Sequence, residues 1–318
     1  MTETRAAEGA WRHRFAVLLV ACTLALIFIG GLVTSTGSGL AVPDWPLSYG
    51  MLMPPMVGGV FFEHGHRMAA TFVGLLTTIL ALWTWRRERR SGVRRLAWAA
   101  LVAVVAQGLL GGLTVKFLLP TPVSVAHACL AQTFFCIVIA LAYATSREFL
   151  GAPATEEDRS GARPAAALAT GVVFVQLAIG AVMRHMGAGL AIPDFPLAAG
   201  RLVPAFDSPG VAVHFAHRVV ALVVLAALSY LTWRARRSGE PRLARAASLA
   251  LALAVVQVAL GGATVLSGRA VVPTTVHVAT GAAVLGTCWL ITLRAYRLLR
   301  RGPARETATA PARLAVPS

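Results

Sequence analysis

Charged side chains are scarce in this sequence, and acidic ones are the scarcest. Asp, Glu, Lys and Arg together make up 13% of the 318 residues, whereas hydrophobic residues make up 57%, and the mean hydropathy is +0.70. A soluble chain of this length carries far more charge on its water-exposed surface. The composition therefore excludes a soluble globular protein and predicts a protein of the lipid bilayer.

Cysteine is also rare. The four cysteines lie inside apolar stretches and form no CxxC pair: Cys22, Cys129, Cys136 and Cys288. A disulfide framework or a zinc site requires closely spaced cysteines or mixed Cys and His clusters. The sequence offers neither, so these cysteines are interpreted as small apolar packing residues.

Eight apolar stretches are long enough to cross a bilayer, which takes roughly 20 residues in a helix. They lie at about 15–35, 62–85, 96–117, 123–145, 165–186, 211–233, 246–267 and 273–293. The sequence therefore predicts an all-α membrane protein with eight transmembrane helices.

The basic residues alternate with these stretches in a way that indicates topology. Of the 29 Lys and Arg, 23 lie in the N-terminal tail, in segments 86–95, 146–164 and 234–245, or after residue 293. Basic residues accumulate on the cytoplasmic side, so both termini are predicted to be cytoplasmic in a multi-pass protein of the inner (plasma) cell membrane. The net charge of +16 is thus a topology signal and not a nucleic-acid footprint. Four basic residues fall on the other side: Lys116, Arg184, Arg201 and Arg269.

The chain contains an internal repeat with a period of about 150 residues. The segment GSGLAVPDWPL at 37–47 returns as GAGLAIPDFPL at 187–197, and QGLLGGLTV at 107–115 returns as QVALGGATV at 257–265. Each copy holds an even number of spans, so both run in the same direction through the membrane. We expect two tandem four-helix bundles related by a pseudo-two-fold axis along the membrane normal. The expected boundaries are 1–145 for the first bundle, 146–164 for a cytoplasmic linker, 165–293 for the second bundle and 294–318 for a cytoplasmic tail.

Four of the eight histidines occupy matching places in the repeat. Each lies about four to seven residues into the second or fourth helix of its half, counted from the outer end: His66, His127, His217 and His277. A single intramembrane histidine is commonly a packed core residue, but four in register indicate a function. Two imidazoles on different helices can take both axial positions of a haem iron, whereas zinc or copper needs further ligands that neither half supplies. The pattern predicts one haem site in each half.

Arginines follow two of these histidines directly. Arg67 and Arg218 are placed to meet haem propionates, since a guanidinium binds a carboxylate well. For Arg67 an ion pair with Glu63, four residues earlier, is an equal alternative. The outer loops beside these residues, PDWP at 43–46 and PDFP at 193–196, are interpreted as turns anchored by aromatics or, alternatively, as lids over the haem edges.

The halves differ at one carboxylate. Glu63 precedes His66 by about one helical turn, and the corresponding position in the second half is His214. A carboxylate beside only one of two matching haem sites predicts that this site performs chemistry, with Glu63 as a general base or as a stabiliser of developing charge. A simple helix N-terminal carboxylate is the alternative. His214 lies one turn from His217 and could compete with it for the iron, but the repeat favours His217.

Together these motifs resemble the haem A synthases of bacteria and mitochondria. The matching pieces are TSTGSGL at 34–40, PDWP at 43–46, the Glu63-x-x-His66-Arg67 motif, and the three other histidines in register. The resemblance extends from about residue 15 to 293. It implies that the C8 methyl group of haem O is oxidised to the formyl group of haem A, a cofactor of cytochrome oxidase, by two hydroxylations and loss of water from a geminal diol.

The resemblance also implies a role for each site residue. His66 and His127, with Arg67, would hold the substrate haem in the first half; His217 and His277, with Arg218, would hold a haem B cofactor in the second; and Glu63 would be catalytic. A haem O synthase is a plausible partner, and an electron donor is required. Many bacterial members carry a cysteine pair near the positions of Val42 and Ser48, and this chain does not. A dihaem b-type cytochrome that exchanges electrons with quinone, and a transporter built from parallel repeats, are the alternatives.

Overall fold

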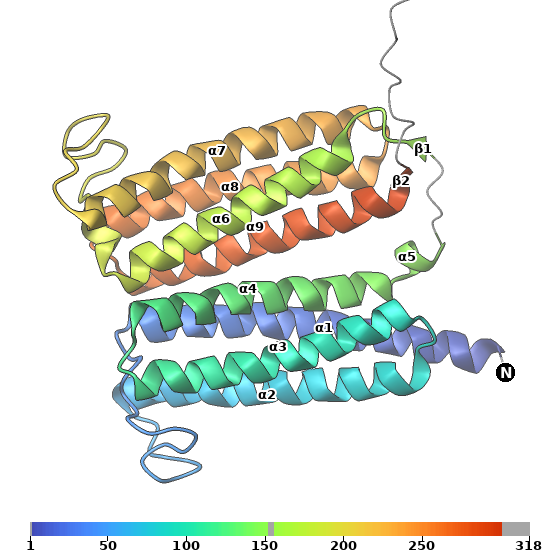
Figure 1. Ribbon diagram of the computed structural model, residues 1–318, viewed down its shortest axis with the longest axis horizontal. Helices are drawn as coiled ribbons and strands as arrows, with labels where there is room; N and C mark the ends of the chain where they lie inside the picture. Colours follow the sequence, from blue (N-terminus) through green and yellow to red (C-terminus); the bar gives the residue numbers. More distant parts are fainter. Residues whose placement is uncertain (1, 152–155, 301–318) are drawn as a thin grey trace, which may run out of the picture.

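The computed structural model describes residues 2–151 and 156–300. Over this part of the chain almost all of the secondary structure is helical (Figure 1). The elements are α1 (Thr2–Ser35), α2 (Gly58–Arg87), α3 (Ser91–Lys116), α4 (Thr121–Ala144), α5 (Arg147–Gly151), β1 (Glu156–Glu157), α6 (Ala162–His185), η1 (Ala188–Leu190), α7 (Pro209–Arg237), α8 (Pro241–Leu266), α9 (Val271–Leu298) and β2 (Leu299–Arg300).

Eight of these helices are long and apolar enough to cross a membrane. The shortest spans have 24 residues, which at 1.5 Å per residue exceeds the roughly 30 Å hydrocarbon core of a bilayer. Their outward faces carry large exposed apolar side chains such as Phe72, Val102 and Leu222, as a lipid-facing surface requires. The predicted all-α membrane protein with eight spans is confirmed.

The eight long helices form two four-helix bundles (Figure 1). In the first, α1, α2, α3 and α4 each pack on their chain neighbours, and α4 closes the ring against α1, so that α2 stands opposite α4. In the second, α6 to α9 repeat this arrangement, and α7 stands opposite α9. Because consecutive helices run antiparallel, the long loops 36–57 and 186–208 emerge at the same end of the molecule. We call this the loop end, and the opposite end, rich in arginine, the basic end.

The bundles contact each other through α1, α4, α6 and α9. Helix α1 packs against α9, and α4 packs against both α6 and α9. Trp289 of α9 donates its indole N–H to the Cys136 carbonyl of α4 at 2.8 Å. A two-fold axis that relates α1 to α6 and α4 to α9 would turn the contact of α1 with α9 into the contact of α6 with α4. The pseudo-symmetry itself stays a prediction.

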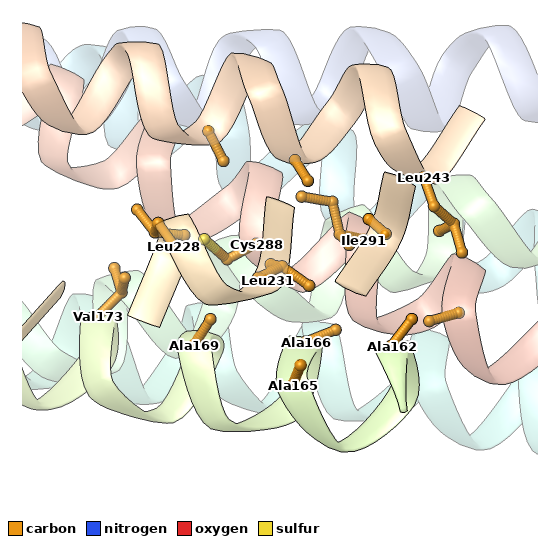
Figure 2. Packing of buried hydrophobic residues seen from close by; sticks show 14 of the residues in the cluster. Ala162, Ala165, Ala166, Ala169, Val173, Leu228, Leu231, Leu243, Cys288 and Ile291 are labelled. Carbon is orange, nitrogen blue, oxygen red and sulfur yellow. The ribbon is translucent and has the colours of Figure 1, made fainter. Parts of the chain in front are cut away.

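Each bundle has its buried apolar core toward the basic end. In the second bundle the core includes Ala162, Ala166 and Ala169 of α6 with Leu228 and Leu231 of α7. Figure 2 shows the small α6 residues lining one side of this layer, and small residues of this kind let neighbouring backbones approach closely. The first bundle has an equivalent cluster over α1 to α4. The four histidines in register lie outside these two clusters, in the loop-end half of each bundle.

The described chain begins and ends at the basic end (Figure 1). The predicted linker 146–164 contains α5, the short β1, which pairs in parallel with β2, and the start of α6. Asp158 there accepts hydrogen bonds from the Ala162 and Arg163 N–H groups, both at 3.0 Å, and so caps α6. Helix α9 continues to Leu298, and most of the predicted tail, from residue 301, lies outside the described residues.

Candidate functional site

The four histidines in register form a layer in the loop-end half of the two bundles. His66, His127, His217 and His277 lie on α2, α4, α7 and α9, about two turns from the loop end of each helix. Their side chains are half-buried, in contrast to the fully buried His64 and His214. The structure therefore places the four predicted ligands at a common level.

Each of these histidines packs edge-on against a glycine of the preceding helix. A Cβ atom at Gly30, Gly111, Gly180 or Gly261 would lie 3.1, 3.2, 2.9 or 3.2 Å from the Cε1 atom of His66, His127, His217 or His277, respectively. Any larger residue would displace the ring. Gly111 and Gly261, the first glycines of the Gly-Gly pairs in the repeated segments 107–115 and 257–265, are thus seats for an imidazole.

Glutamines extend this arrangement at three of the four histidines. Gln107, Gln176 and Gln257 lie four residues before the seat glycine and donate an Nε2–H to the backbone carbonyl of His127, His217 and His277 at 3.0, 2.9 and 2.8 Å. The amide nitrogens of Gln107 and Gln176 also lie 3.3 and 3.4 Å from the Nε2 atoms of these rings. At His66 the corresponding residue is Leu26. The glutamine is therefore absent from one site only.

The histidines of the second bundle face each other. The ring centroids of His217 and His277 are 6.4 Å apart, with an interplanar angle of 65°. An iron between two imidazoles, at roughly 2 Å from each nitrogen, separates the ring centres by about 6 Å. The Nδ1 atoms of His66, His127 and His217 are buried and have no hydrogen-bond partner among the described residues. The donor set and spacing fit an axially ligated haem.

A conventional metal cluster is not formed by these side chains. Within residues 2–151 and 156–300, no three His, Cys, Asp or Glu side chains come together in an arrangement that could hold a metal ion. A pair of imidazoles such as His217 and His277 is a sufficient set of protein ligands only where the remaining ligands belong to a macrocycle.

Glu63 lies one turn before His66 and ties the first loop to α2. It is 4% exposed. Its Oε2 accepts the Val42 backbone N–H at 2.8 Å, and its Oε1 pairs with Arg67 Nη2 at 2.6 Å. The ion pair that the sequence offered as an alternative for Arg67 is therefore present.

Arg67 is also bonded to the backbone of the first loop. Its Nη1 donates to the Asp44 and Leu47 carbonyls at 2.8 and 2.9 Å. His64, next to Glu63, is hydrogen-bonded through Nδ1 to Ser48 Oγ at 2.8 Å. Three polar residues in one stretch of five positions on α2, Glu63, His64 and Arg67, thus hold the first loop beside His66.

The second half repeats this anchoring with different side chains. His214, at the place of Glu63, is 3% exposed and accepts the Ile192 backbone N–H on Nδ1 at 3.3 Å. Arg218 donates to the Leu197 and Asp194 carbonyls at 2.7 and 2.6 Å. His214 is therefore engaged with the loop, whereas His217 faces His277.

Each long loop packs one aromatic side chain against a glycine of its own bundle. A Cβ at Gly112 would lie 2.6 Å from Trp45 Cδ2, and one at Gly262 would lie 2.8 Å from Phe195 Cδ1. The second glycine of each pair is thus the contact point of a loop aromatic, directly beside the seat of His127 or His277. Their role as lids over a haem edge stays a prediction.

An aspartate organises the tip of each loop. Asp44 accepts the Gly50 and Tyr49 N–H groups at 2.8 and 2.7 Å, and Asp194 accepts those of Gly200 and Ala199 at the same distances. These backbone hydrogen bonds hold the pKa of both carboxyls below its ordinary value, with the Gly50 and Gly200 bonds contributing most. Because Tyr49 and Ala199 have φ of 53° and 54°, the turn requires left-handed backbone at a non-glycine position.

The glutamine and glycine seats are the site residues that the sequence analysis missed. The sequence signal for these residues is a five-residue segment that ends in the seat glycine and occurs four times. QGLLG at 107–111 and QVALG at 257–261 belong to the repeat described above, and QLAIG at 176–180 and LIFIG at 26–30 are the two further copies. Spacing of four places the two end residues on one helix face. Only comparison of all four helices reveals this pattern.

Comparison with known proteins agrees with this arrangement. The COX15-CtaA family, described as "Cytochrome oxidase assembly protein", matches residues 13–58 and 57–289. A protein named "Heme A synthase" from Symbiobacterium thermophilum is 33% identical over 251 residues, covering 76% of this chain and 81% of that protein. Proteins of the same name from Shouchella clausii and Halalkalibacterium halodurans are 32% and 31% identical over 81% and 80% of this chain, and 87% of each relative is covered. The suspected resemblance is confirmed: the chain belongs to the COX15-CtaA family of cytochrome oxidase assembly proteins.

Proposed function

We propose that this protein is a haem A synthase, an oxidoreductase that converts the C8 methyl group of haem O to the formyl group of haem A. The observation that carries the proposal is the layer of four glycine-seated histidines, two in each bundle. The relatives named "Heme A synthase" supply the reaction. The protein would act in the cell membrane, with its basic end and both termini in the cytoplasm.

The residues divide between the two halves as follows. His66 and His127 would hold the iron of haem O in the first bundle, and His217 and His277 would hold haem B in the second. When bound, haem B would supply one-electron chemistry. The loops 36–57 and 186–208, each anchored by an arginine and an aromatic, limit access of water at the loop end.

Glu63 is the residue proposed to take part in the oxidation. It lies on the His66 side of the first bundle and carries the only carboxylate at this position of the repeat. A carboxylate there can accept a proton as the methyl group is oxidised. Its bonds to Val42 and Arg67 fix its oxygens in place. Contact of Arg67 and Arg218 with haem propionates, alongside their bonds to the loop carbonyls, remains a prediction.

The proposal is tested by co-expressing the protein with an enzyme that produces haem O, a plausible partner because the lipophilic substrate must be handed over. Extracted haems are then separated by chromatography. Haem A or its hydroxylated precursor is expected, and neither is expected with His66→Ala. A haem-loaded protein that produces neither compound would overturn the proposal.

A dihaem b-type cytochrome that exchanges electrons with quinone is the second candidate. One observation favours it: Glu63 and His214 accept corresponding loop N–H groups, those of Val42 and Ile192. A role for Glu63 in anchoring the loop alone would account for this contact without any catalytic carboxylate. The candidates differ in how they treat haem. A cytochrome keeps two unmodified haems with bis-histidine spectra, and a synthase changes one of them. In either case His217→Ala or His277→Ala is expected to deplete haem B from the second bundle.

A further inference from the structure

The two bundles differ on the helix that seats the histidine following the long loop. Gly30 of α1 and Gly180 of α6 are the seats of His66 and His217. Four residues before them stand Leu26 and Gln176, and four residues after them stand Thr34 and Arg184. Positions four apart lie on one face of a helix. The two differences therefore flank the haem ligand from both sides.

Gln176 supports His217 in a way that no residue within 2–151 or 156–300 supports His66. Its amide donates to the His217 carbonyl at 2.9 Å and lies 3.4 Å from His217 Nε2. Leu26 has no polar group for this purpose. The hydrogen bond to the His217 carbonyl holds the turn of α7 that carries the ring. A ligand whose orientation is held in place binds its metal more tightly.

Arg184 is a positive charge without a carboxylate partner among the described residues. It lies near the loop end of α6, and its Nη2 donates to the Gly31 carbonyl at 3.1 Å and to Ser35 Oγ at 3.2 Å, both on α1. It also lies within electrostatic range of His277. Neither oxygen carries a charge, so the guanidinium can still bind an anion. In the first bundle, Thr34 donates only to the Gly30 carbonyl of its own helix.

A haem bound between His217 and His277 would supply that anion. Its only anionic groups are the two propionates, and a guanidinium recognises a carboxylate strongly where water is excluded. Arg184 lies one turn from the seat of His217 toward the loop end. The position of the charge therefore fits a propionate directed toward the loop end.

We infer that Gln176 and Arg184 make the second bundle a haem-retaining site, with Arg184 binding a propionate, whereas Leu26 and Thr34 make the first bundle a haem-releasing site. The inference rests on the proposed function, since a synthase must keep its cofactor and release its product. It places the difference between cofactor and substrate sites on α1 and α6, and not on the four histidines.

The test measures haem loss from purified full-length protein loaded with haem B, with an excess of apomyoglobin as the acceptor. His66→Ala confines haem to the second bundle, and His217→Ala confines it to the first. In the first background, Arg184→Thr is expected to accelerate loss about 10-fold or more, since a charge-assisted hydrogen bond contributes at least this factor. Gln176→Leu removes a neutral hydrogen bond and is expected to accelerate loss about 5-fold. Arg201 is an exposed arginine of the second loop, and Arg201→Thr is the matched control, which should leave the rate of haem loss unchanged.

In the His217→Ala background, Leu26→Gln combined with Thr34→Arg should slow the loss of haem from the first bundle.

Haem B dimethyl ester, which lacks the propionate charges, separates propionate binding from a structural role. Wild-type protein should lose this ester at least as fast as Arg184→Thr loses haem B, and Arg184→Thr should not accelerate its loss further. Arg184→Lys should restore part of the retention of haem B. If Arg184→Thr accelerates loss of the ester as much as loss of haem B, the arginine only joins α6 to α1 and the inference is overturned.

The rates at which wild-type protein loses haem B and its dimethyl ester can be compared without any variant at Arg184. This comparison therefore remains a test even if Arg184→Thr folds poorly. Equal rates of loss from the two bundles would also overturn the inference. None of these measurements involves conversion of haem O. Failure of the synthase assay with unequal retention would therefore reject the proposed function alone.

Discussion

At the residue scale, Glu63 has two tasks: it is an observed anchor of the first loop and a proposed catalytic residue. It was predicted to be either a catalytic carboxylate or a helix-terminal charge, and the structure shows it holding the Val42 N–H and Arg67 at once. Its counterpart His214 holds the Ile192 N–H, so the anchoring of the loop does not require a carboxylate. The catalytic role proposed for Glu63 therefore rests on its charge, which His214 does not share at the corresponding position.

Glu63→His separates these two tasks, because it places in the first half the side chain that anchors the second. We expect the variant to keep its bound haem and its folded first loop. Conversion of haem O should fall about 100-fold or more, as for loss of a general base. The measurement is haem A formed per bound haem, with hydrogen exchange of residues 36–57 as the reading of loop order.

Glu63→Gln is the companion variant, since it removes the charge with little change in shape. It too should retain haem and lose conversion. Full turnover by Glu63→His with an ordered loop would remove Glu63 from the chemistry and leave it as a loop anchor.

At the scale of the elements, the short connection between α2 and α3 also bonds to α1 and α4 at the basic end. Glu88 is buried there and pairs with Arg12 of α1 at 2.8 Å and with Arg90 at 2.9 Å, while Arg90 also donates to the Ala144 carbonyl at the end of α4. Hydrogen bonds from the Arg90 side chain, with its N–H and the charge of Arg12, lower the pKa of Glu88 from 4.5 to about 2. The carboxylate form thus stabilises the first bundle.

This pKa predicts how stability depends on pH. A lowered carboxyl pKa contributes stability that is complete above pH 4.5 and is lost as the pH falls toward 2. Glu88→Gln should therefore lower the free energy of unfolding by about 2 kcal/mol at pH 7. The difference from wild type should shrink below pH 4.5. Thermal unfolding in detergent at pH 7, 5 and 3 measures it.

Glu157→Gln is the control for this prediction, because Glu157 pairs with the largely exposed Arg159. Exposed pairs contribute little, so this variant should follow wild type at each pH. A difference between Glu88→Gln and wild type that stays constant from pH 7 to 3 would contradict the role given to the Glu88 ion pairs.

At the scale of the whole molecule, the two bundles form one body because α4 and α9 approach closely. A Cβ at Gly286 of α9 would lie 2.8 Å from Phe135 Cε1 and 2.9 Å from Ile139 Cδ1 of α4. The Trp289 to Cys136 hydrogen bond and the Arg294 to Glu148 ion pair, at 2.9 Å, reinforce the same boundary. This contact fixes the distance between the two histidine pairs, across which electrons would pass.

Gly286→Ala should therefore loosen the contact between the bundles. Overpacking of a buried contact costs about 1 to 3 kcal/mol, and the thermal midpoint in detergent should fall by a few degrees. Gly74→Ala, in the middle of α2, is the matched control, because nothing lies within 4 Å of its added Cβ. The control should equal or exceed wild type in stability. Equal midpoints for the two variants would show that the close approach of α4 and α9 is not required.

The sequence by itself determined the number of spans, the repeat and the four histidines in register. These depend on local properties: the length of an apolar run, the position of arginines and the identity of residues 150 positions apart. A bilayer permits few alternatives to a helix for such runs. The all-α class and the family could therefore be recognised before any contact between helices was known.

Only the tertiary structure decided what each polar residue touches. The glycine seats join different helices, and Glu63 meets Val42 because the first loop folds back over α2. His64 and His214 are buried loop anchors although their neighbours His66 and His217 are not. Hydrophobic and charge patterns are blind to such contacts, since a hydrogen bond between residues 21 positions apart depends on the path of the loop between them.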